Sequence, residues 1–217
     1  MFERLQLINT TFPPKAKRLG TRKKRVVEKD SGSLTDTIMK FCIDYQRILI
    51  AGEVDTFYSD VFTKKVKEYN TRDIHGVIAF CSPLAENDAL ELKRTVNDVT
   101  LVLHKSKGET VPDYVEVKHF GKTVLMIFQE VACHSYLTFP TIDGRIIAIA
   151  SPDTLITMYY SIMIFTNTAR KHFPGLGHQI TNLVKWVEEN RTTRSPVIPA
   201  FSLNCRSETV SEYSCNC

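Results

Sequence analysis

The stretch from residue 121 to residue 165 restricts the possible folds of this chain more than any other part of it. Residues 123–128 are an unbroken apolar run with β-branched residues, which is typical of a strand buried on both faces, and residues 145–150 have the same character. Ser151-Pro152-Asp153 then predicts a helix start, because it supplies an N-cap hydroxyl, a proline where no amide donor is needed and a carboxylate in the first turn. Residues 155–165 are apolar on nearly every side, so we expect a helix inside a core. A bilayer needs about 20 apolar residues, more than this helix has.

Length and composition are those of an ordinary globular protein. The 217 residues suffice for one large domain or two small ones with a real core, and 43% hydrophobic and 24% charged residues are usual proportions. The first residues lack the apolar segment of a signal peptide, so we expect an intracellular protein whose six cysteines are reduced thiols. The sequence contains no P-loop, no G-x-G-x-x-G, no G-x-S-x-G and no C-x-x-C pair, so it does not indicate the functions that these motifs mark.

Residues 1–32 show no sustained periodicity and are predicted to be a flexible arm. The arm contains seven basic residues with no acidic residue between them: Lys15, Lys17, Arg18, Arg22, Lys23, Lys24 and Arg25. Because these seven charges exceed the net charge of +4, the rest of the chain carries a net charge of −3. Clustered basic side chains favour RNA binding through the release of counterions. One alternative is a solvated terminus without a binding role. Another is an anionic membrane, which would satisfy the same charges.

Helical and extended patterns alternate along the remaining chain. Predicted helices begin near Ser33, Val54, Ser82, Ser151 and Leu176, and predicted strands cover residues 48–51, 74–80, 99–103, 114–119, 123–130 and 145–150. Gly121 lies between two of these strands and predicts an antiparallel hairpin, while Ser82 before Pro83 is expected to be an N-cap. The pattern predicts an α+β fold, in which a mixed sheet with flanking helices is followed by a mainly helical C-terminal part. The expected regions are a basic arm (1–32), an α+β region (33–150), a helical region (151–206) and a flexible tail (207–217).

Few polar residues stand out as candidates for chemistry. Cys133-His134 lies in a polar segment and could be half of a metal site, but no second Cys/His pair completes four ligands. We therefore expect a strand-end turn with a buried thiol. Glu116 and Glu130 could approach each other on the hairpin and hold a cation, or they could belong to a solvated sheet face. Cys215 and Cys217 resemble the prenylated ends of Rab-type GTPases, but the chain lacks their P-loop, so exposed tail thiols are the favoured interpretation.

Five motifs carry a resemblance to a known family. They are, in chain order, VPDYVEV (111–117), EVACHSY (130–136), IAIASPDTLITMYYSIMIF (147–165), EENR (188–191) and PAFSLNC (199–205). With these motifs the chain resembles the poly(A) polymerase-like proteins of the large nucleocytoplasmic DNA viruses, over about residues 31–206. The resemblance implies a nucleotidyltransferase fold with a glycine motif at a helix start. It also implies three carboxylates that hold Mg²⁺ while an adenylyl group is transferred to a 3′ oxygen.

The acids that this resemblance calls for are largely missing. Ala51-Gly52 aligns with the family's glycine pair and keeps half of it, and together with Ser82 it is implied to bind the nucleotide. Val77 and Ala79 stand where the two aspartates of a D-x-D strand belong, and neither can hold Mg²⁺. Glu116 is the one candidate for the third, catalytic carboxylate.

The resemblance therefore favours a protein that keeps the fold with reduced or absent catalysis and needs no cofactor. Its expected partners are RNA, through the basic arm, and a second copy or an active poly(A) polymerase. The expected location is the host cytoplasm or a viral factory, with the virion as a further possibility. One alternative is an active enzyme that uses Mg²⁺ and ATP with displaced acids at Glu53, Asp60 or Asp73. A second, less favoured alternative is a membrane-associated protein that uses the arm together with Cys215 and Cys217.

Overall fold

Helices and strands are mixed in the first part of the chain, a run of strands follows between residues 99 and 150, and a run of helices between residues 152 and 190 comes after it, close to the order that the sequence predicts. The computed structural model describes residues 31–54, 56–58, 68–71, 74, 76–105, 111–131, 133–190 and 201–202. The helices are α2 (Ser31–Asp44), α4 (Ala85–Thr95), α5 (Pro152–Phe165), α6 (Asn167–Arg170) and α7 (Leu176–Asn190). The strands are β1 (Ile48–Ala51), β2 (Ile78–Ser82), β3 (Val99–His104), β4 (Tyr114–His119), β5 (Lys122–Gln129), β6 (Cys133–His134), β7 (Tyr136–Pro140), β8 (Ile146–Ala150) and β9 (Phe201–Ser202).

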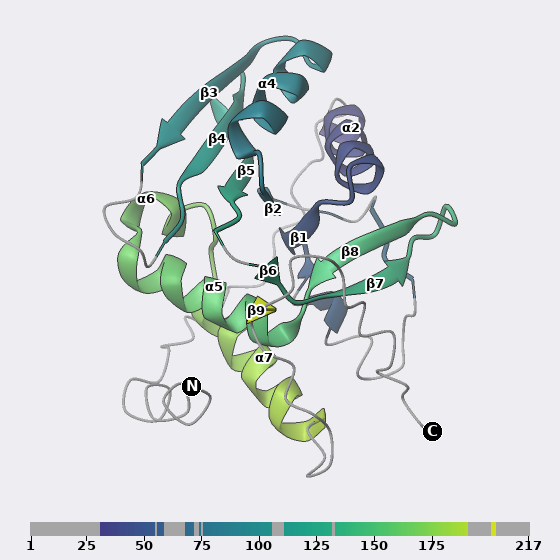
Figure 1. The fold of residues 1–217 in the computed structure, drawn as a ribbon, viewed down its shortest axis with the longest axis vertical. Helices are drawn as coiled ribbons and strands as arrows, with labels where there is room; N and C mark the ends of the chain where they lie inside the picture. Colours follow the sequence, from purple (N-terminus) through teal and green to yellow (C-terminus); the bar gives the residue numbers. More distant parts are fainter. Residues whose placement is uncertain are drawn as a thin grey trace.

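Most of the strands belong to one mixed sheet. Its seven strands lie in the order β3-β4-β5-β2-β1-β8-β7 (Figure 1). The β1–β8 and β2–β5 pairs are parallel, and the other neighbouring pairs are antiparallel. Strands β1 and β2 are buried at every residue, which explains why they appear in the sequence as continuous apolar runs. The predicted α+β fold with a mixed sheet is confirmed, and so is the β4–β5 hairpin.

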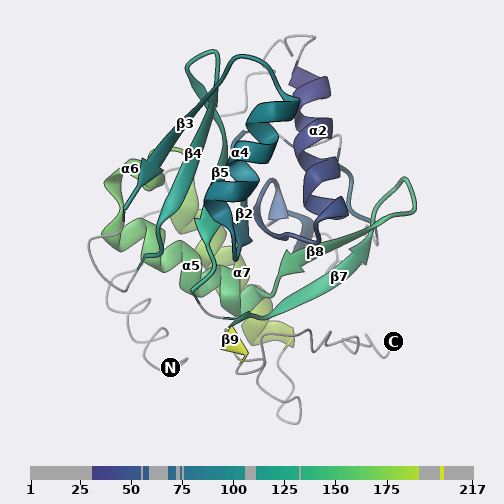
Figure 2. The ribbon, with the colours of Figure 1, turned by 45° about the horizontal axis from the view of Figure 1, so that its top comes forward.

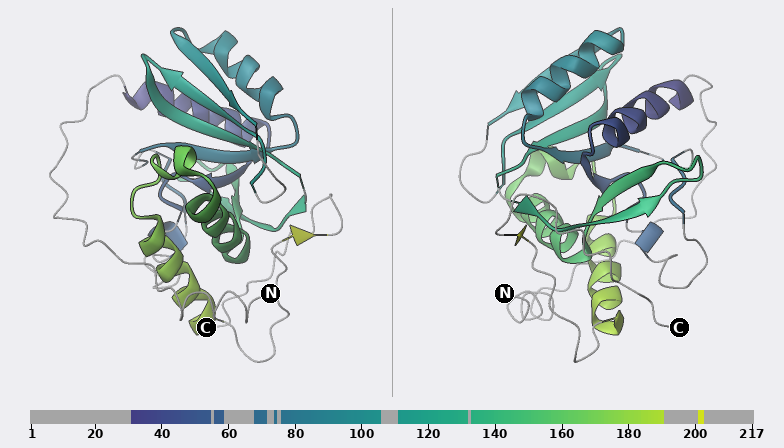
Figure 3. Two further views of the ribbon diagram at one scale, coloured as in Figure 1. Left: turned by 90° about the vertical axis from the view of Figure 1, so that its left-hand side faces the viewer. Right: turned by 45° about the vertical axis from the view of Figure 1, so that its right-hand side comes forward.

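Helices cover both faces of this sheet. Helices α2 and α4 lie on one face, and α5, α6 and α7 lie on the other (Figure 3). On the first face the ring of Phe41 in α2 stacks on Phe80 in β2, with 6.1 Å between the ring centroids. On the second face the hydroxyl of Tyr159 in α5 donates a 2.7 Å hydrogen bond to the carbonyl oxygen of Ile50. The side chains of the central strands are therefore removed from water on both sides, which is the main source of folding free energy.

Helix α5 begins as its sequence predicts. Ser151 is the N-cap, and its side-chain oxygen accepts a 3.3 Å hydrogen bond from the amide of Thr154, while Pro152 occupies the first turn. Eight residues of the helix are buried, so the apolar segment indeed lies in the core. The hydroxyl of Tyr58 donates a 2.8 Å hydrogen bond to the carbonyl oxygen of Ala150, which ties the end of β8 to the region after β1.

Three local predictions are wrong. The strand expected at residues 74–80 is β2 at Ile78–Ser82, because Ile74 packs over Gly52 and does not enter the sheet. Ser82 ends β2, and the N-cap of α4 is Leu84, which makes no side-chain capping bond. The segment around Cys133-His134 is not a simple turn, since β6 pairs with β9 and the unpredicted strand β7 follows.

Several sequence features fall outside the described residues. These are the basic cluster at residues 15–25, Asp60, Asp73, Cys215 and Cys217. Of the helix predicted from Val54, the structure describes residue 54 and residues 56–58, all of them helical. In the part of the chain that is described, no helix has the length and apolar character needed to cross a membrane.

Candidate functional site

Two of the positions implied for metal-binding acids, Ala79 and Glu116, lie on one face of the sheet. Strand pairing places Ala51 beside Ala79, Ala79 beside Met126, and Met126 beside Glu116. Because paired residues on neighbouring strands point to the same face, these residues form one row across the sheet. We call Ala51, Ala79, Met126 and Glu116 the cross-strand row. All four are at most 7% exposed.

The cross-strand row does not fit a magnesium site. Mg²⁺ takes oxygen ligands, above all carboxylates, whereas alanine and methionine offer only methyl and thioether groups. Val77, directly before β2, is equally unable to bind the ion. Strand β5 separates Glu116 from Ala79, which puts these residues two strand spacings, or about 10 Å, apart. Among the described residues, no group of three His, Cys, Asp or Glu side chains could hold a metal ion.

The turn after β1 is covered by side chains of the same protein. Gly52 has a φ of +122°, which permits the sharp turn into Glu53. The hydroxyl of Tyr69 donates a hydrogen bond to the carbonyl oxygen of Gly52. A Cβ atom at Gly52 would lie 3.5 Å from Tyr69 Oη and 3.5 Å from Ile74 Cγ2. Glu53, one of the alternative acids, is partly exposed, and its Oε2 atom accepts a 3.4 Å hydrogen bond from Thr56.

Ser82 points away from the cross-strand row. Side chains alternate along a strand, so Ser82 shares the face of Phe80, which packs on α2, and lies opposite to Ala79. Its Oγ atom accepts a 3.0 Å hydrogen bond from the amide of Leu84, and the residue is fully buried. The two groups implied to bind a nucleotide, Ala51-Gly52 and Ser82, are therefore not brought together on one face.

Glu116 lies at the centre of a polar cluster that the sequence did not predict. Its Oε2 atom is 3.0 Å from Nε2 of His104 in β3. Its Oε1 atom accepts a hydrogen bond from the hydroxyl of Thr123 in β5. The same Oε1 atom is 3.2 Å from Nε2 of His172, which follows α6, and 3.6 Å from Nζ of Lys118 in β4. We call these five residues the Glu116 cluster.

The Glu116 cluster holds an ionised carboxylate. Burial alone would raise the pKa of Glu116, but the hydrogen bonds from Thr123 and His104 and the charge of Lys118 outweigh it, and the pKa lies below its usual value. The pKa of His172 is also lowered, chiefly by burial, against the opposing effect of the Glu116 charge. Both carboxylate oxygens are thus engaged within the protein, which favours a structural role for this acid over a catalytic one.

The pair Glu116 and Glu130 does not form a cation site. Glu116 is paired with Met126, so Glu130 lies four residues farther along the sequence, beyond the end of β5. At about 3.4 Å per residue, this offset separates the two carboxylates by more than 10 Å along the strand direction. The amide of Glu130 donates a 2.8 Å hydrogen bond to the carbonyl oxygen of Ser82, next to the start of α4.

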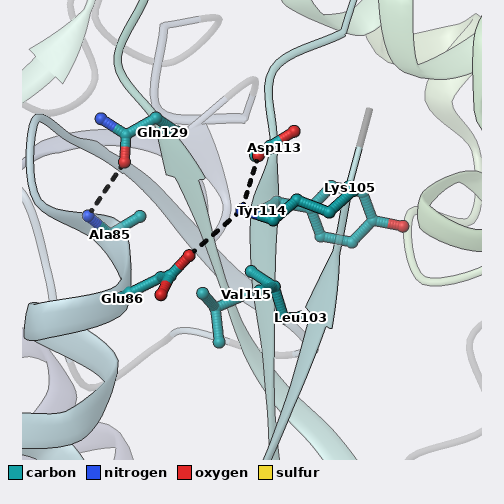
Figure 4. Close-up of a pocket in the computed structure, with 8 residues that line it drawn as sticks. All are labelled: Ala85, Glu86, Leu103, Lys105, Asp113, Tyr114, Val115 and Gln129. Atoms are coloured by element: carbon teal, nitrogen blue, oxygen red, sulfur yellow. Dashed lines mark hydrogen bonds and ion pairs between the residues drawn. The ribbon is translucent and has the colours of Figure 1, made fainter. Parts of the chain in front are cut away.

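A small open pocket of about 230 Å³ lies between the start of α4 and the ends of β3, β4 and β5 (Figure 4). Nζ of Lys105 lies 3.3 Å from Glu86 Oε1 and 3.0 Å from Asp113 Oδ2. The amide of Ala85 donates a 3.4 Å hydrogen bond to Gln129 Oε1, and both residues line the pocket. Because two carboxylates already neutralise the lysine, the pocket has no surplus charge that would select a phosphate.

The strand order and the helices on both faces define an α+β protein built on a mixed seven-stranded sheet. Among solved structures, it is similar to the crystal structure of the Megavirus polyadenylate synthase, with a TM-score of 0.59 and 13% sequence identity. The match covers 86% of this chain and 40% of that chain, so this chain spans well under half of the viral protein's length. No protein-family model matches the sequence, and no curated protein matches it. The likeness shows the fold, which is nucleotidyltransferase-like.

Proposed function

We propose that this chain is linked to mRNA 3′-end polyadenylation, has lost adenylyl transfer and serves as an RNA-binding or polymerase-pairing subunit. The observation that carries the proposal is the cross-strand row, in which Ala51, Ala79 and Met126 are apolar and buried. Two-metal catalysis needs acids that share the ions, and Glu116 has no carboxylate beside it in the row. The similarity of the fold to a viral polyadenylate synthase supports the link to polyadenylation.

Loss of catalysis leaves two uses for a fold of this kind. The basic cluster at residues 15–25 supplies positive charge for RNA, and the helix-covered sheet supplies a stable body for pairing with an active poly(A) polymerase or a second copy. Such a protein would work where viral mRNA is made, in the host cytoplasm or a viral factory. It would need neither Mg²⁺ nor ATP.

Primer extension tests the loss of catalysis. The purified protein is incubated with a labelled oligo(A) primer, ATP and Mg²⁺ or Mn²⁺, next to Glu116→Gln and the exposed-acid control Glu189→Gln. We expect no elongation by any of them. Elongation by the wild type and by Glu189→Gln, but not by Glu116→Gln, would overturn the proposal and make Glu116 catalytic. If the wild type elongates the primer and a variant of Glu53, Asp60 or Asp73 does not, that residue would be one of the displaced catalytic acids.

Retardation of a labelled single-stranded RNA tests the role of the arm. In the full chain, replacing the seven basic residues of the arm by glutamine should weaken binding and flatten its salt dependence. Each lost phosphate contact removes about 0.7 from the slope of log K against log salt concentration. Unchanged affinity and slope would contradict RNA binding by the arm. Co-purification with an active poly(A) polymerase would then be the remaining test of a pairing role.

A further inference from the structure

The turn between β4 and β5 carries an exposed aromatic residue in an unfavourable backbone conformation. His119 pairs with Lys122, so the turn consists of Phe120 and Gly121, with φ values of +47° and +75°. Two-residue hairpins with positive φ at both positions strongly prefer Asn, Asp or Gly there. A bulky residue at positive φ is an outlier, and this one gains little from packing, because Phe120 is 75% exposed. An outlier of this kind at an exposed position points to a use outside the fold.

Basic side chains gather at the same end of the sheet. The pairing of Val99 with His119 and a 3.4 Å hydrogen bond from the Phe120 amide to the Asp98 carbonyl oxygen place the start of β3 beside the turn. Helix α4 ends shortly before β3, so its last turn lies at this end as well (Figure 2). The exposed basic residues here are Lys93, Arg94 and Lys122, whereas the partly buried Lys118 is already paired with Glu116 at 3.6 Å. The acids at this end are Asp98 and Glu91, and Glu91 is paired with Arg94 at 2.9 Å.

We propose that Phe120 is a base-stacking site for single-stranded RNA, with Lys93 and Lys122 contacting the phosphates on either side of the stacked base. Aromatic rings exposed among basic side chains bind single strands in this way, because every base has a face on which a ring can stack. The ring of His119 lies 4.4 Å from that of Phe120 in an edge-on arrangement, which supports the aromatic platform from one side. Duplex RNA is excluded because its bases are already stacked. The inference rests on the proposed RNA-binding function and adds a contact on the folded body, separate from the arm.

Fluorescence anisotropy with a short labelled single-stranded RNA tests this contact in the full chain. Phe120→Ala should weaken binding by about fivefold or more, the loss that corresponds to one stacked base. The matched control is Phe165→Ala, since Phe165 is also exposed, at 57%, but lies at the end of α5. Lys122→Ala should weaken binding to all sequences and lower the salt slope by about one. An RNA that carries 5-iodouridine should crosslink to the peptide containing Phe120.

A second variant separates binding from folding. Asparagine suits the left-handed turn, so Phe120→Asn should unfold at a higher urea concentration than the wild type and still bind RNA as weakly as Phe120→Ala. Equal RNA affinity of Phe120→Ala and wild type would overturn the contact while leaving the proposed function in place. Vesicles of phosphatidylcholine and phosphatidylserine that bind only when Phe120 is present, with RNA affinity unchanged, would replace RNA by a membrane surface. Primer elongation by the wild type would overturn the loss of catalysis and leave the Phe120 contact standing.

Discussion

At the scale of single residues, the Glu116 carboxylate is stabilised by the other members of the Glu116 cluster, because its neighbours in the cross-strand row are apolar. His104→Ala removes a 3.0 Å hydrogen bond to a buried charge, so we expect the free energy of unfolding to fall by about 1–3 kcal/mol. Urea unfolding at neutral pH measures this change. His119→Ala, on the same hairpin but outside the cluster, should stay within about 0.5 kcal/mol of the wild type. Equal losses in the two variants would show that the cluster contributes no specific stability.

His134 gives the protein a pH-dependent stability. Burial lowers its pKa from 6.5 to about 4, so the unfolded chain binds a proton at a higher pH than the folded protein does. The part of the free energy of unfolding that depends on His134 is therefore fully present above pH 6.5. It falls by up to about 3 kcal/mol as the pH drops toward about 4. Urea midpoints measured across this range should fall less steeply for His134→Gln than for wild type. Parallel curves for the two proteins would contradict the assignment. The acid sensitivity of the protein would then come from Glu116 and His172, whose pKa values are also lowered in the folded state.

The sequence identified some of these residues and not the contacts between them. Glu116 was singled out by a motif, and its burial follows from its place in β4. The partnership with His104 depends on strand register, and that with His172 depends on a segment far away in the chain, neither of which leaves a periodic signal. Gly121 correctly predicted a hairpin, but nothing in the sequence indicated that Phe120 would take the left-handed position beside it.

At the scale of elements, α5 is the helix whose start the sequence specified most completely. Ser151→Ala removes the side-chain cap on the amide of Thr154 and should cost about 0.5–2 kcal/mol of stability. Ser161→Ala, within the same helix, should have little effect or stabilise slightly, since alanine has the higher helix propensity. Thermal unfolding of the two variants measures the difference. A loss in Ser161→Ala as large as that in Ser151→Ala would contradict the importance of the cap.

Elements buried on both faces were predictable, and those placed by tertiary contacts were not. Strand β1 matches its predicted bounds, because four consecutive apolar residues are stable only where both faces of the strand are buried. Strand β2 begins later than predicted because Ile74 is used to cover Gly52. Strand β7 was missed because it follows a polar segment and forms the edge of the sheet. There Tyr69 donates from its amide to the carbonyl oxygen of Pro140 at 2.8 Å.

At the scale of the whole molecule, the buried hydrophobic side chains form one core, whose members come from positions between Ile38 and Val187. The fully buried thiols of Cys42 and Cys81 report on it, because burial raises the pKa of each and keeps the reactive thiolate rare. We expect both to react with a thiol reagent only at the rate of global unfolding. Mass spectrometry of the labelled peptides against urea concentration tests this. Labelling of Cys42 or Cys81 well before the main unfolding transition would show that the layers separate independently.

The position of β8 determines when the sheet can close during synthesis. Strand β1 lies between β2 and β8, and β8 begins at Ile146, far along the chain from Ile48. At about 5–20 residues per second, one edge of β1 stays without its partner for several seconds after it leaves the ribosome. Through that interval β1, a strand made only of apolar residues, presents a bare backbone edge, which is the state that chaperones bind and that other nascent chains can join. The central stretch that dictates the fold is thus also the part whose late arrival leaves the nascent chain most open to aggregation.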